Sequence, residues 1–151
     1  MPPEIIVFFS SMLPIIELRG SIPVGFAMGM PAEAVFLWAY IGNIIPCFFI
    51  LWLLGPVSRF LMRHSKFFNK FFTKLFEKTQ HKHKDALEKY GPILLIVFVA
   101  IPLPGSGGWT GSLVAFLFGI KYWKAMGLIA IGLAIAGIVI TLGAMGIVSI
   151  L

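Results

Sequence analysis

The heptapeptide ELRGSIP at residues 17–23 interrupts the first apolar region of the chain, residues 5–30. A charged side chain at the centre of a membrane-spanning helix costs about 2.5–3.5 kcal/mol, whereas each leucine, isoleucine or phenylalanine returns only about 0.3–0.6 kcal/mol. A straight span through this acid and this arginine is therefore marginal. The arms at residues 4–16 and 22–30 are each long enough, as helices, to cross about half of a bilayer. The heptapeptide therefore predicts a re-entrant helical hairpin.

A second interruption, PLPGSG at residues 102–107, divides the third apolar region, residues 92–120. The two prolines and three glycines within residues 102–108 cannot continue a helix without losing backbone hydrogen bonds. In lipid, irregular backbone is tolerated only where it is buried in protein or lines a wet cavity. The sequence therefore predicts a second re-entrant hairpin, whose tip meets the tip of the first.

The two remaining apolar regions, residues 32–57 and 121–151, are typical of ordinary transmembrane helices. The first contains Asn43 and Pro46 but no charge beyond its first turn. The second carries small residues along its length, which let helix backbones approach closely in lipid. These small residues predict a packing surface, either within the protein or between two copies, and we expect a homodimer.

The composition indicates a membrane protein with one domain, residues 1–151. Of the 151 residues, 59% are hydrophobic and 12% are charged, which is about half of the charged share of a soluble domain. The net charge of +6 does not indicate nucleic-acid binding, because nine of the twelve basic residues form one block between apolar regions. These nine are Arg59, Arg63, Lys66, Lys70, Lys74, Lys78, Lys82, Lys84 and Lys89.

The basic block, residues 58–91, contains phenylalanines at helical spacing beside lysines that are four residues apart. We expect a cytoplasmic amphipathic helix at the membrane interface, with its rings toward acyl chains and its lysines toward anionic headgroups. Such a helix either fixes the topology or collects an anionic lipid substrate. His81 and His83 lie among lysines, which oppose a cation, so no metal site is predicted. The apolar residues of the amphipathic pattern are Phe67, Phe68, Phe71, Phe72, Leu75 and Phe76, and its lysines are Lys66, Lys70, Lys74 and Lys78.

The order of these segments predicts an inverted repeat. Aligning residues 26–29 with residues 116–119 also places Gly42 on Gly132, and the single span between the halves gives them opposite orientations. The predicted fold is an all-α integral membrane protein, in which a re-entrant hairpin plus a transmembrane helix occurs twice, joined by the basic interfacial helix. The charge asymmetry places that connector in the cytoplasm and both termini outside the plasma (inner) membrane.

The two hairpin tips predict a binding site for an anion. Ser21 is expected to cap a half-helix that has Pro23 in its first turn, and Thr110 or Ser112 to cap the matching arm. Two helix N-termini would then point at Arg19 and form, with its guanidinium, a receptor for phosphate or carboxylate.

Glu17 is expected to neutralise Arg19 in the empty site and to carry a proton, because desolvation disfavours a charged carboxylate. The simpler alternative is an ion pair that only holds the hairpin together. The prolines and glycines of the second tip have an equally simple role as turn formers. Asn43 and Thr141 are expected to make helix-packing hydrogen bonds, with cavity lining as the alternative. The candidate site residues are Glu17, Arg19, Gly20, Ser21, Pro23, Asn43, Pro102, Pro104, Gly105 and Ser106.

The two motifs, in this order and each in a short hairpin before a span, resemble the small multidrug export family over nearly the whole chain. That family is similar, more distantly, to the DedA/VTT superfamily. Its members have opposed re-entrant hairpins and are linked to recycling of polyprenyl phosphate carriers, lipid scrambling and proton-dependent membrane homeostasis. The second hairpin departs from the superfamily pattern because residues 92–120 carry no charge. The resemblance implies a functional role for Glu17, Arg19, Pro23, Pro102, Pro104 and Gly105.

The leading hypothesis is a transporter or flippase for an anionic amphiphile such as a lipid phosphate, unassisted or coupled to protons or another ion. The alternative is a proton-coupled exporter of small drugs that exchanges protons at Glu17, although the neighbouring Arg19 opposes a cation. An enzyme is not expected, because metal-assisted phosphate chemistry uses several carboxylates and Glu17 is the single acid at depth. No cofactor is expected. A non-transporting structural protein is the remaining alternative.

Overall fold

The chain folds into helices joined by short turns, and the residues that the structure describes contain no strand. The predicted all-α class is therefore confirmed. The computed structural model describes residues 1–81, 84–103 and 105–151, without the side chains of His81, Lys84 and Leu87. The elements in chain order are α1 (Pro3–Met12), α2 (Glu17–Ala27), α3 (Ala32–His64), α4 (Lys66–Phe76), the π-helical turn η1 (Glu77–His81), α5 (Lys84–Ala100), α6 (Gly108–Leu117) and α7 (Tyr122–Ile150).

Helices α3 and α7 are long and apolar enough to cross a membrane, as the sequence predicted for these two regions. They pack against each other, and the Tyr40 hydroxyl on α3 donates a 2.9 Å hydrogen bond to the Ala130 carbonyl on α7. Helix α3 continues to His64 instead of ending at residue 57, because no residue after Pro56 breaks the helix until Ser65 adopts an extended conformation. The first part of the predicted basic connector therefore belongs to α3.

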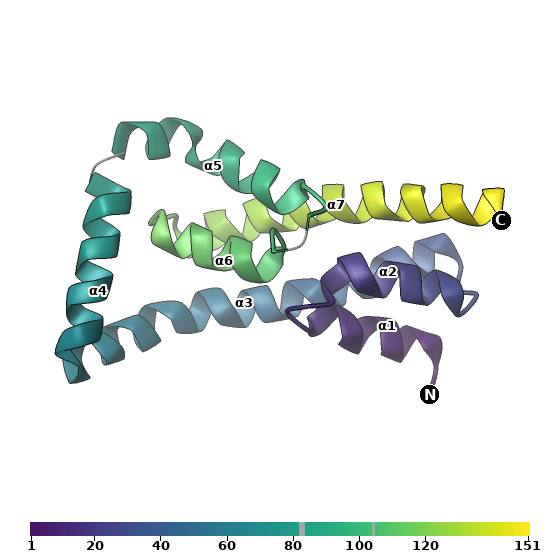
Figure 1. The fold of residues 1–151 in the computed structure, drawn as a ribbon, viewed down its shortest axis with the longest axis horizontal. Helices are drawn as coiled ribbons and strands as arrows, with labels where there is room; N and C mark the ends of the chain where they lie inside the picture. Colours follow the sequence, from purple (N-terminus) through teal and green to yellow (C-terminus); the bar gives the residue numbers. More distant parts are fainter. Residues whose placement is uncertain (82–83, 104) are drawn as a thin grey trace.

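Each half of the chain also contains a pair of short helices that is interrupted where the sequence changes from apolar to turn-forming (Figure 1). The first break lies at residues 13–16, earlier than predicted. Pro14 is its cause, because the residue before a proline avoids the helical region, and Leu13 has φ −77° and ψ 137°. Helix α2 then starts at Glu17, so Ser21 and Pro23 lie inside α2. The prediction that Ser21 caps a half-helix is wrong.

The second break, at residues 101–107, lies where the proline- and glycine-rich segment predicted it. Helix α6 starts at Gly108, directly after Gly107, and no side chain caps it. Thr110 and Ser112 therefore lie inside α6, and the prediction that one of them is the cap is wrong. The Ser112 hydroxyl instead donates a 2.7 Å hydrogen bond to the Gly108 carbonyl within the helix.

Glycines at matching places in the two halves have matching structural roles. Gly29 and Gly119 both adopt positive φ, +79° and +71°, and end the second helix of each pair. Gly42 lets α1 lie on α3, since an added Cβ would overlap the Ser11 hydroxyl and the Phe8 carbonyl. Gly132 lets α5 lie on α7, since an added Cβ would come within 2.8 Å of the Val99 side chain. Close approach of backbones is the usual function of glycine between membrane helices.

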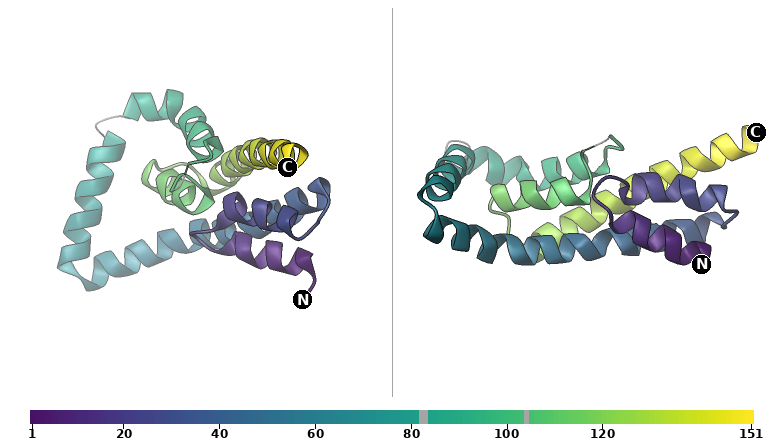
Figure 2. Two further views of the ribbon diagram at one scale, coloured as in Figure 1. Left: turned by 45° about the vertical axis from the view of Figure 1, so that its right-hand side comes forward. Right: turned by 60° about the horizontal axis from the view of Figure 1, so that its bottom comes forward.

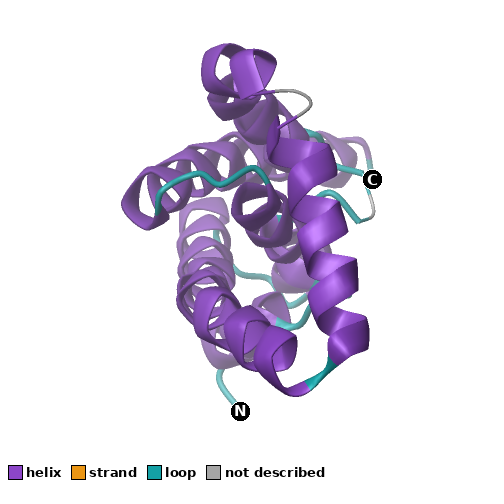
Figure 3. Ribbon diagram, turned by 90° about the vertical axis from the view of Figure 1, so that its left-hand side faces the viewer, coloured by secondary structure: helices purple, strands orange, loops and turns teal. Residues whose placement is uncertain are grey.

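The amphipathic connector is α4, which crosses one end of the molecule and joins α3 to α5 (Figure 3). No residue of α4 is buried, and its Phe76 ring packs edge-on against Phe116 of α6. Both chain termini lie at the opposite end of the molecule (Figure 2). The predicted histidine pair falls outside the description, because the structure does not describe residues 82–83 or the side chain of His81.

Candidate functional site

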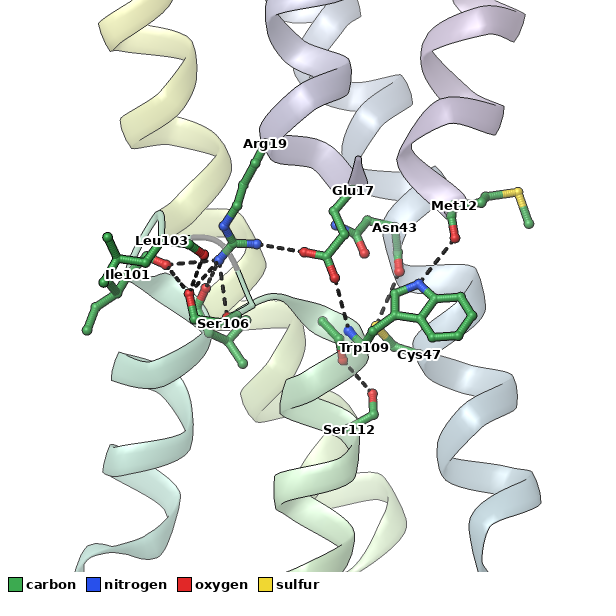
Figure 4. A network of polar contacts seen from close by, with 12 residues as sticks. Met12, Glu17, Arg19, Asn43, Cys47, Ile101, Leu103, Ser106, Trp109 and Ser112 are labelled. Atoms are coloured by element: carbon green, nitrogen blue, oxygen red, sulfur yellow. Dashed lines mark hydrogen bonds and ion pairs between the residues drawn. The ribbon is translucent and has the colours of Figure 1, made fainter. Parts of the chain in front are cut away.

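The centre of the molecule contains a nearly buried ion pair (Figure 4). Arg19 Nη1 lies 2.8 Å from Glu17 Oε2, and the exposed fractions of the two side chains are 14% and 7%. Both residues lie in the first turn of α2. The structure thus contains the ion pair that both interpretations of the sequence predicted, and its role in an empty binding site stays a prediction. A buried pair of this kind is costly to break, because removing one partner leaves an uncompensated charge in a medium of low dielectric constant.

Arg19 also reaches across to the second helix pair. Its Nη2 donates to the carbonyls of Val99 and Ile101, both at 2.9 Å, and to the carbonyl of Ser106 at 3.2 Å. Two of these carbonyls lie at the C-terminal end of α5 and just beyond it, where a helix presents its negative pole. The Ser106 hydroxyl donates 2.8 Å hydrogen bonds to the carbonyls of Ile101 and Leu103, which fixes the loop around the guanidinium.

Glu17 makes the complementary contact with α6. Its Oε1 accepts a 3.3 Å hydrogen bond from the backbone N–H of Trp109, in the first turn of α6. A carboxylate is favourable at this place, because the first N–H groups of a helix lack partners and its N-terminus is the positive pole. The acid therefore lies at the start of α6, and the arginine at the end of α5. The two breaks meet, as predicted.

Gly107 permits this contact. An added Cβ at this position would overlap the Glu17 carboxylate. The backbone of Gly107, with φ −84° and ψ −164°, is one that any residue adopts, so the space and not the conformation requires glycine here. Trp109 adds a further tie, since its indole Nε1 donates a 3.2 Å hydrogen bond to the carbonyl of Met12 at the end of α1.

Glu17 has φ +49°, and it is the only non-glycine residue with positive φ in the described part of the chain. For a glutamate this left-handed conformation costs of order 1–3 kcal/mol and persists only where surrounding contacts enforce it. The ion pair and the Trp109 N–H are such contacts. Backbone strain of this kind is found mostly at functional sites, which makes Glu17 a candidate functional residue.

Asn43 lies beside this junction on α3. Its side chain is fully buried, and its Oδ1 would lie 3.1 Å from a Cβ added to Gly108, the first residue of α6. Among the residues that the structure describes, neither Nδ2 nor Oδ1 has a hydrogen-bond partner, and the Thr141 hydroxyl on α7 has none either. The prediction that Asn43 and Thr141 make packing hydrogen bonds is therefore wrong. Arg19 Nε and the Ser21 hydroxyl are also buried without a partner in the described part of the chain.

The other predicted site residues differ in how far they are exposed and in what they contact. Ser106 is buried and touches Arg19. Gly20 faces the side chain of Ile16 within its own helix pair, since an added Cβ would lie 2.7 Å from Ile16 Cγ2. Pro23 and Pro102 are exposed, and Gly105, with φ +83°, forms a turn, which is the simpler role that the sequence allowed. Pro104 lies outside the described residues.

The open receptor predicted for an anion needs a correction. Arg19 is already bonded to Glu17 and to backbone carbonyls, and Glu17 itself occupies the start of α6. The start of α2 is at Glu17 and does not supply a second free N-terminus. Within the described residues, no three histidine, cysteine or acidic side chains gather as metal ligands.

Sequence reasoning placed Gly107 at the end of the second tip without naming it as a site residue, and it missed Trp109. The glycine pair GG before tryptophan, at the start of an apolar helix, was the available signal. Such a pair at a helix start marks a place where another group approaches the backbone closely. The sequence does not show that the approaching group is Glu17, because that contact depends on how two distant helix pairs pack.

These observations define an all-helical protein with two helices long and apolar enough to cross a membrane, in which two interrupted helix pairs meet at a buried acid–arginine pair. The chain belongs to the family described as "Putative small multi-drug export protein", whose model matches residues 17–139. The matched region begins at the acid of the ion pair, directly after the first break, and includes the second break, so the predicted family is confirmed. Searches of curated proteins and of solved structures found no significant match. The family description points to export across a membrane.

Proposed function

We propose that the protein is a proton-coupled membrane transporter for an anionic amphiphile, and that the Glu17–Arg19 pair controls access to its binding site. In this proposal, the α1–α2 and α5–α6 pairs are re-entrant hairpins that enter a plasma membrane from opposite faces. Helices α1, α2 and α6 have 10, 11 and 10 residues, and each therefore reaches about 15 Å, half of the hydrocarbon thickness.

An inverted repeat is part of the same proposal. It is supported by the matching turns at Gly29 and Gly119 and by the matching helix contacts at Gly42 and Gly132. The basic helix α4 lies at the end opposite to both termini, which supports a cytoplasmic connector and external termini under the positive-inside rule. Transporters built from inverted repeats bind substrate near the membrane midplane, at interrupted helices.

The single observation that carries the proposed mechanism is the position of the Glu17 carboxylate. It occupies the place between Arg19 and the Trp109 N–H that an anionic headgroup would need. Protonation of Glu17 removes the charge that holds it there and leaves Arg19 and the start of α6 with an excess of positive potential. An anionic headgroup then takes that place, and deprotonation of Glu17 expels it. One proton thus accompanies one negative charge.

Asn43 supports an anionic substrate. Its Nδ2 is a buried donor without an acceptor, and an unpaired amide in a packed interior costs about 1–3 kcal/mol. A headgroup oxygen at the start of α6 would supply the missing acceptor. We therefore propose that Asn43, Arg19 and the Trp109 N–H bind the headgroup together, and that Glu17 competes with it.

A second candidate, export of small cationic drugs with proton exchange at Glu17, is favoured by the family description. The geometry opposes it. The carboxylate is already paired with Arg19 at 2.8 Å, and a cation next to that guanidinium would be repelled strongly at low dielectric constant. The same lone carboxylate argues for transport instead of metal-assisted catalysis, which uses several acids.

A homodimer belongs to the proposal as well. Gly132 and Gly137 of α7 are used inside the protomer, against Val99 and Phe36. Gly127, Gly143 and Gly146 are exposed, and an added Cβ at any of them would meet open space. An unused glycine surface on a transmembrane helix suits contact with a second copy.

The test uses purified protein in phosphatidylcholine liposomes. Its probes are fluorescent phosphatidic acid, fluorescent phosphatidylcholine and the cationic dye ethidium, with Arg19→Gln as the variant and the exposed Arg59→Gln as its matched control. We expect the wild type and Arg59→Gln to move the phosphatidic acid, and Arg19→Gln to lose that activity. Movement of ethidium alone would instead establish the second candidate. No flux of any probe would indicate a structural protein.

A further inference from the structure

A cavity lies between the connector helix α4 and the helices α3 and α6. Its volume is about 240 Å³, and helices α3, α4 and α6 all contribute to its wall. This connector pocket is lined by Leu54, Val57, Ser58, Leu61, Phe72, Leu75, Leu113, Phe116 and Leu117. It lies away from Glu17 and Arg19, and nothing in the mechanism above uses it.

The wall of the connector pocket suits hydrocarbon. Ser58 is its one hydroxyl-bearing residue, and that hydroxyl donates a 2.9 Å hydrogen bond to the Gly55 carbonyl on its own helix. The lining therefore offers an occupant only apolar contact. Sites for whole drug-sized molecules usually have volumes of about 300–1,000 Å³, so a pocket of about 240 Å³ fits part of a molecule, such as a hydrocarbon tail.

One face of α6 connects the connector pocket with the ion-pair junction. Leu113, Phe116 and Leu117 lie four, seven and eight residues after Trp109, which places all four on one side of the helix. Trp109 at one end supplies the N–H that holds Glu17, and Phe116 and Leu117 at the other end line the pocket. Trp109 and Phe116 are separated by about 10 Å along the helix axis. Leu113 between them is 46% exposed, and Trp109, Phe116 and Leu117 are partly exposed.

Charge around the connector pocket selects an anionic amphiphile. Helix α4, which contributes Phe72 and Leu75 to the wall, carries three exposed lysines and no acidic residue. A basic amphipathic helix at a membrane surface attracts anionic headgroups. An anionic amphiphile that approaches α4 therefore meets a place for its tail beside the helix that leads to Arg19. The lysines of α4 are Lys66, Lys70 and Lys74, and Lys78 follows in η1.

We infer that the connector pocket binds the hydrocarbon tail of the transported amphiphile while its anionic headgroup occupies the junction at the start of α6. This inference rests on the proposed function and narrows its substrate class. The substrate is an anion with a tail that spans about 10 Å or more along α6, and not a small hydrophilic anion. A phosphate without a tail is therefore not expected to be carried.

The first test fills the pocket. Leu54 lines it, and its neighbour Leu53 is 47% exposed and is absent from the lining. Leu54→Trp is the variant and Leu53→Trp is the matched control, both assayed for movement of dodecyl phosphate in phosphatidylcholine liposomes. We expect Leu54→Trp to reduce flux by roughly tenfold, because overfilling a packed apolar site is strongly unfavourable, and Leu53→Trp to match the wild type. Equal flux in both variants would overturn the inference, even if the wild type transports the probe.

The second test does not require a bulky residue. Leu54→Cys and Leu53→Cys are labelled with a membrane-permeant maleimide, with little background because Cys47 is fully buried. Dodecyl phosphate is expected to slow labelling at position 54 and not at position 53, and ethyl phosphate to slow neither. Equal protection by dodecanol would overturn the inference, because the occupant would then be any hydrocarbon. Protection at position 54 without flux in the wild type would support the pocket and refute the transport proposal.

Discussion

Replacing Gly107 with alanine tests the position of the Glu17 carboxylate. The alanine Cβ would overlap the carboxylate, whereas the backbone at φ −84° and ψ −164° accepts alanine without strain. The carboxylate must therefore leave both Arg19 Nη1 and the Trp109 N–H. Breaking a buried ion pair costs about 3–5 kcal/mol. We expect about 3 kcal/mol, because Arg19 Nη2 keeps its bonds to the carbonyls beyond α5.

The assay for this prediction is reversible unfolding in mixed micelles, with Gly127→Ala as the matched control. An added Cβ at Gly127 meets open space, so this variant should be neutral, or more stable by about 0.5–1 kcal/mol because glycine weakens a helix interior. Gly107→Ala should lose about 3 kcal/mol in the same assay. If both variants unfold with the free energy of the wild type, the carboxylate does not lie against Gly107, and the description of the junction is incorrect.

Three further predictions concern the surroundings of the junction. Asn43→Leu should leave the free energy of unfolding unchanged or raise it by about 1 kcal/mol, because an unpaired buried amide is removed. Flux of phosphatidic acid should fall in the same variant. Unchanged flux would contradict a role of Asn43 in binding the headgroup. Gly42→Ala and Gly132→Ala should each destabilise by about 1–3 kcal/mol in the unfolding assay through overpacking, and a loss at only one of them would contradict matching halves. Gly146→Cys should give disulfide-linked dimers in native membranes, and recovery of monomer alone would refute the homodimer.

The sequence predicts the parts of this fold that depend on local physics. Hydropathy over a long window identifies α3 and α7, and clustered prolines and glycines identify the second break. The sequence argument expects the first break between residues 16 and 22, because it rests on the cost of inserting Glu17 and Arg19 into a membrane. The observed break at residues 13–16 is set by Pro14. That proline already forces Leu13 out of the helical region. The charged residues therefore lie in the first turn of α2, after the break.

The site was only half predictable for a related reason. The Glu17–Arg19 pair is local, and two opposite charges two residues apart at membrane depth are expected to pair. The partners of that pair across the molecule come from a segment about 90 residues away in the chain, and no local pattern gives their register. The lack of a partner for Asn43 likewise depends on the packing of α3 against α6.

The most direct test of the central claim is the pH dependence of phosphatidic acid flux in the wild type and in Glu17→Gln. The account holds that a charged Glu17 excludes the headgroup and a protonated Glu17 admits it. Flux in the wild type should therefore rise as the pH falls, whereas Glu17→Gln, which mimics the protonated acid, should give high flux that does not vary with pH. Glu33→Gln, a change at an exposed acid on α3, should behave as the wild type. If Glu17→Gln retains the pH dependence of the wild type, Glu17 is not the coupling group and the proposed mechanism is wrong.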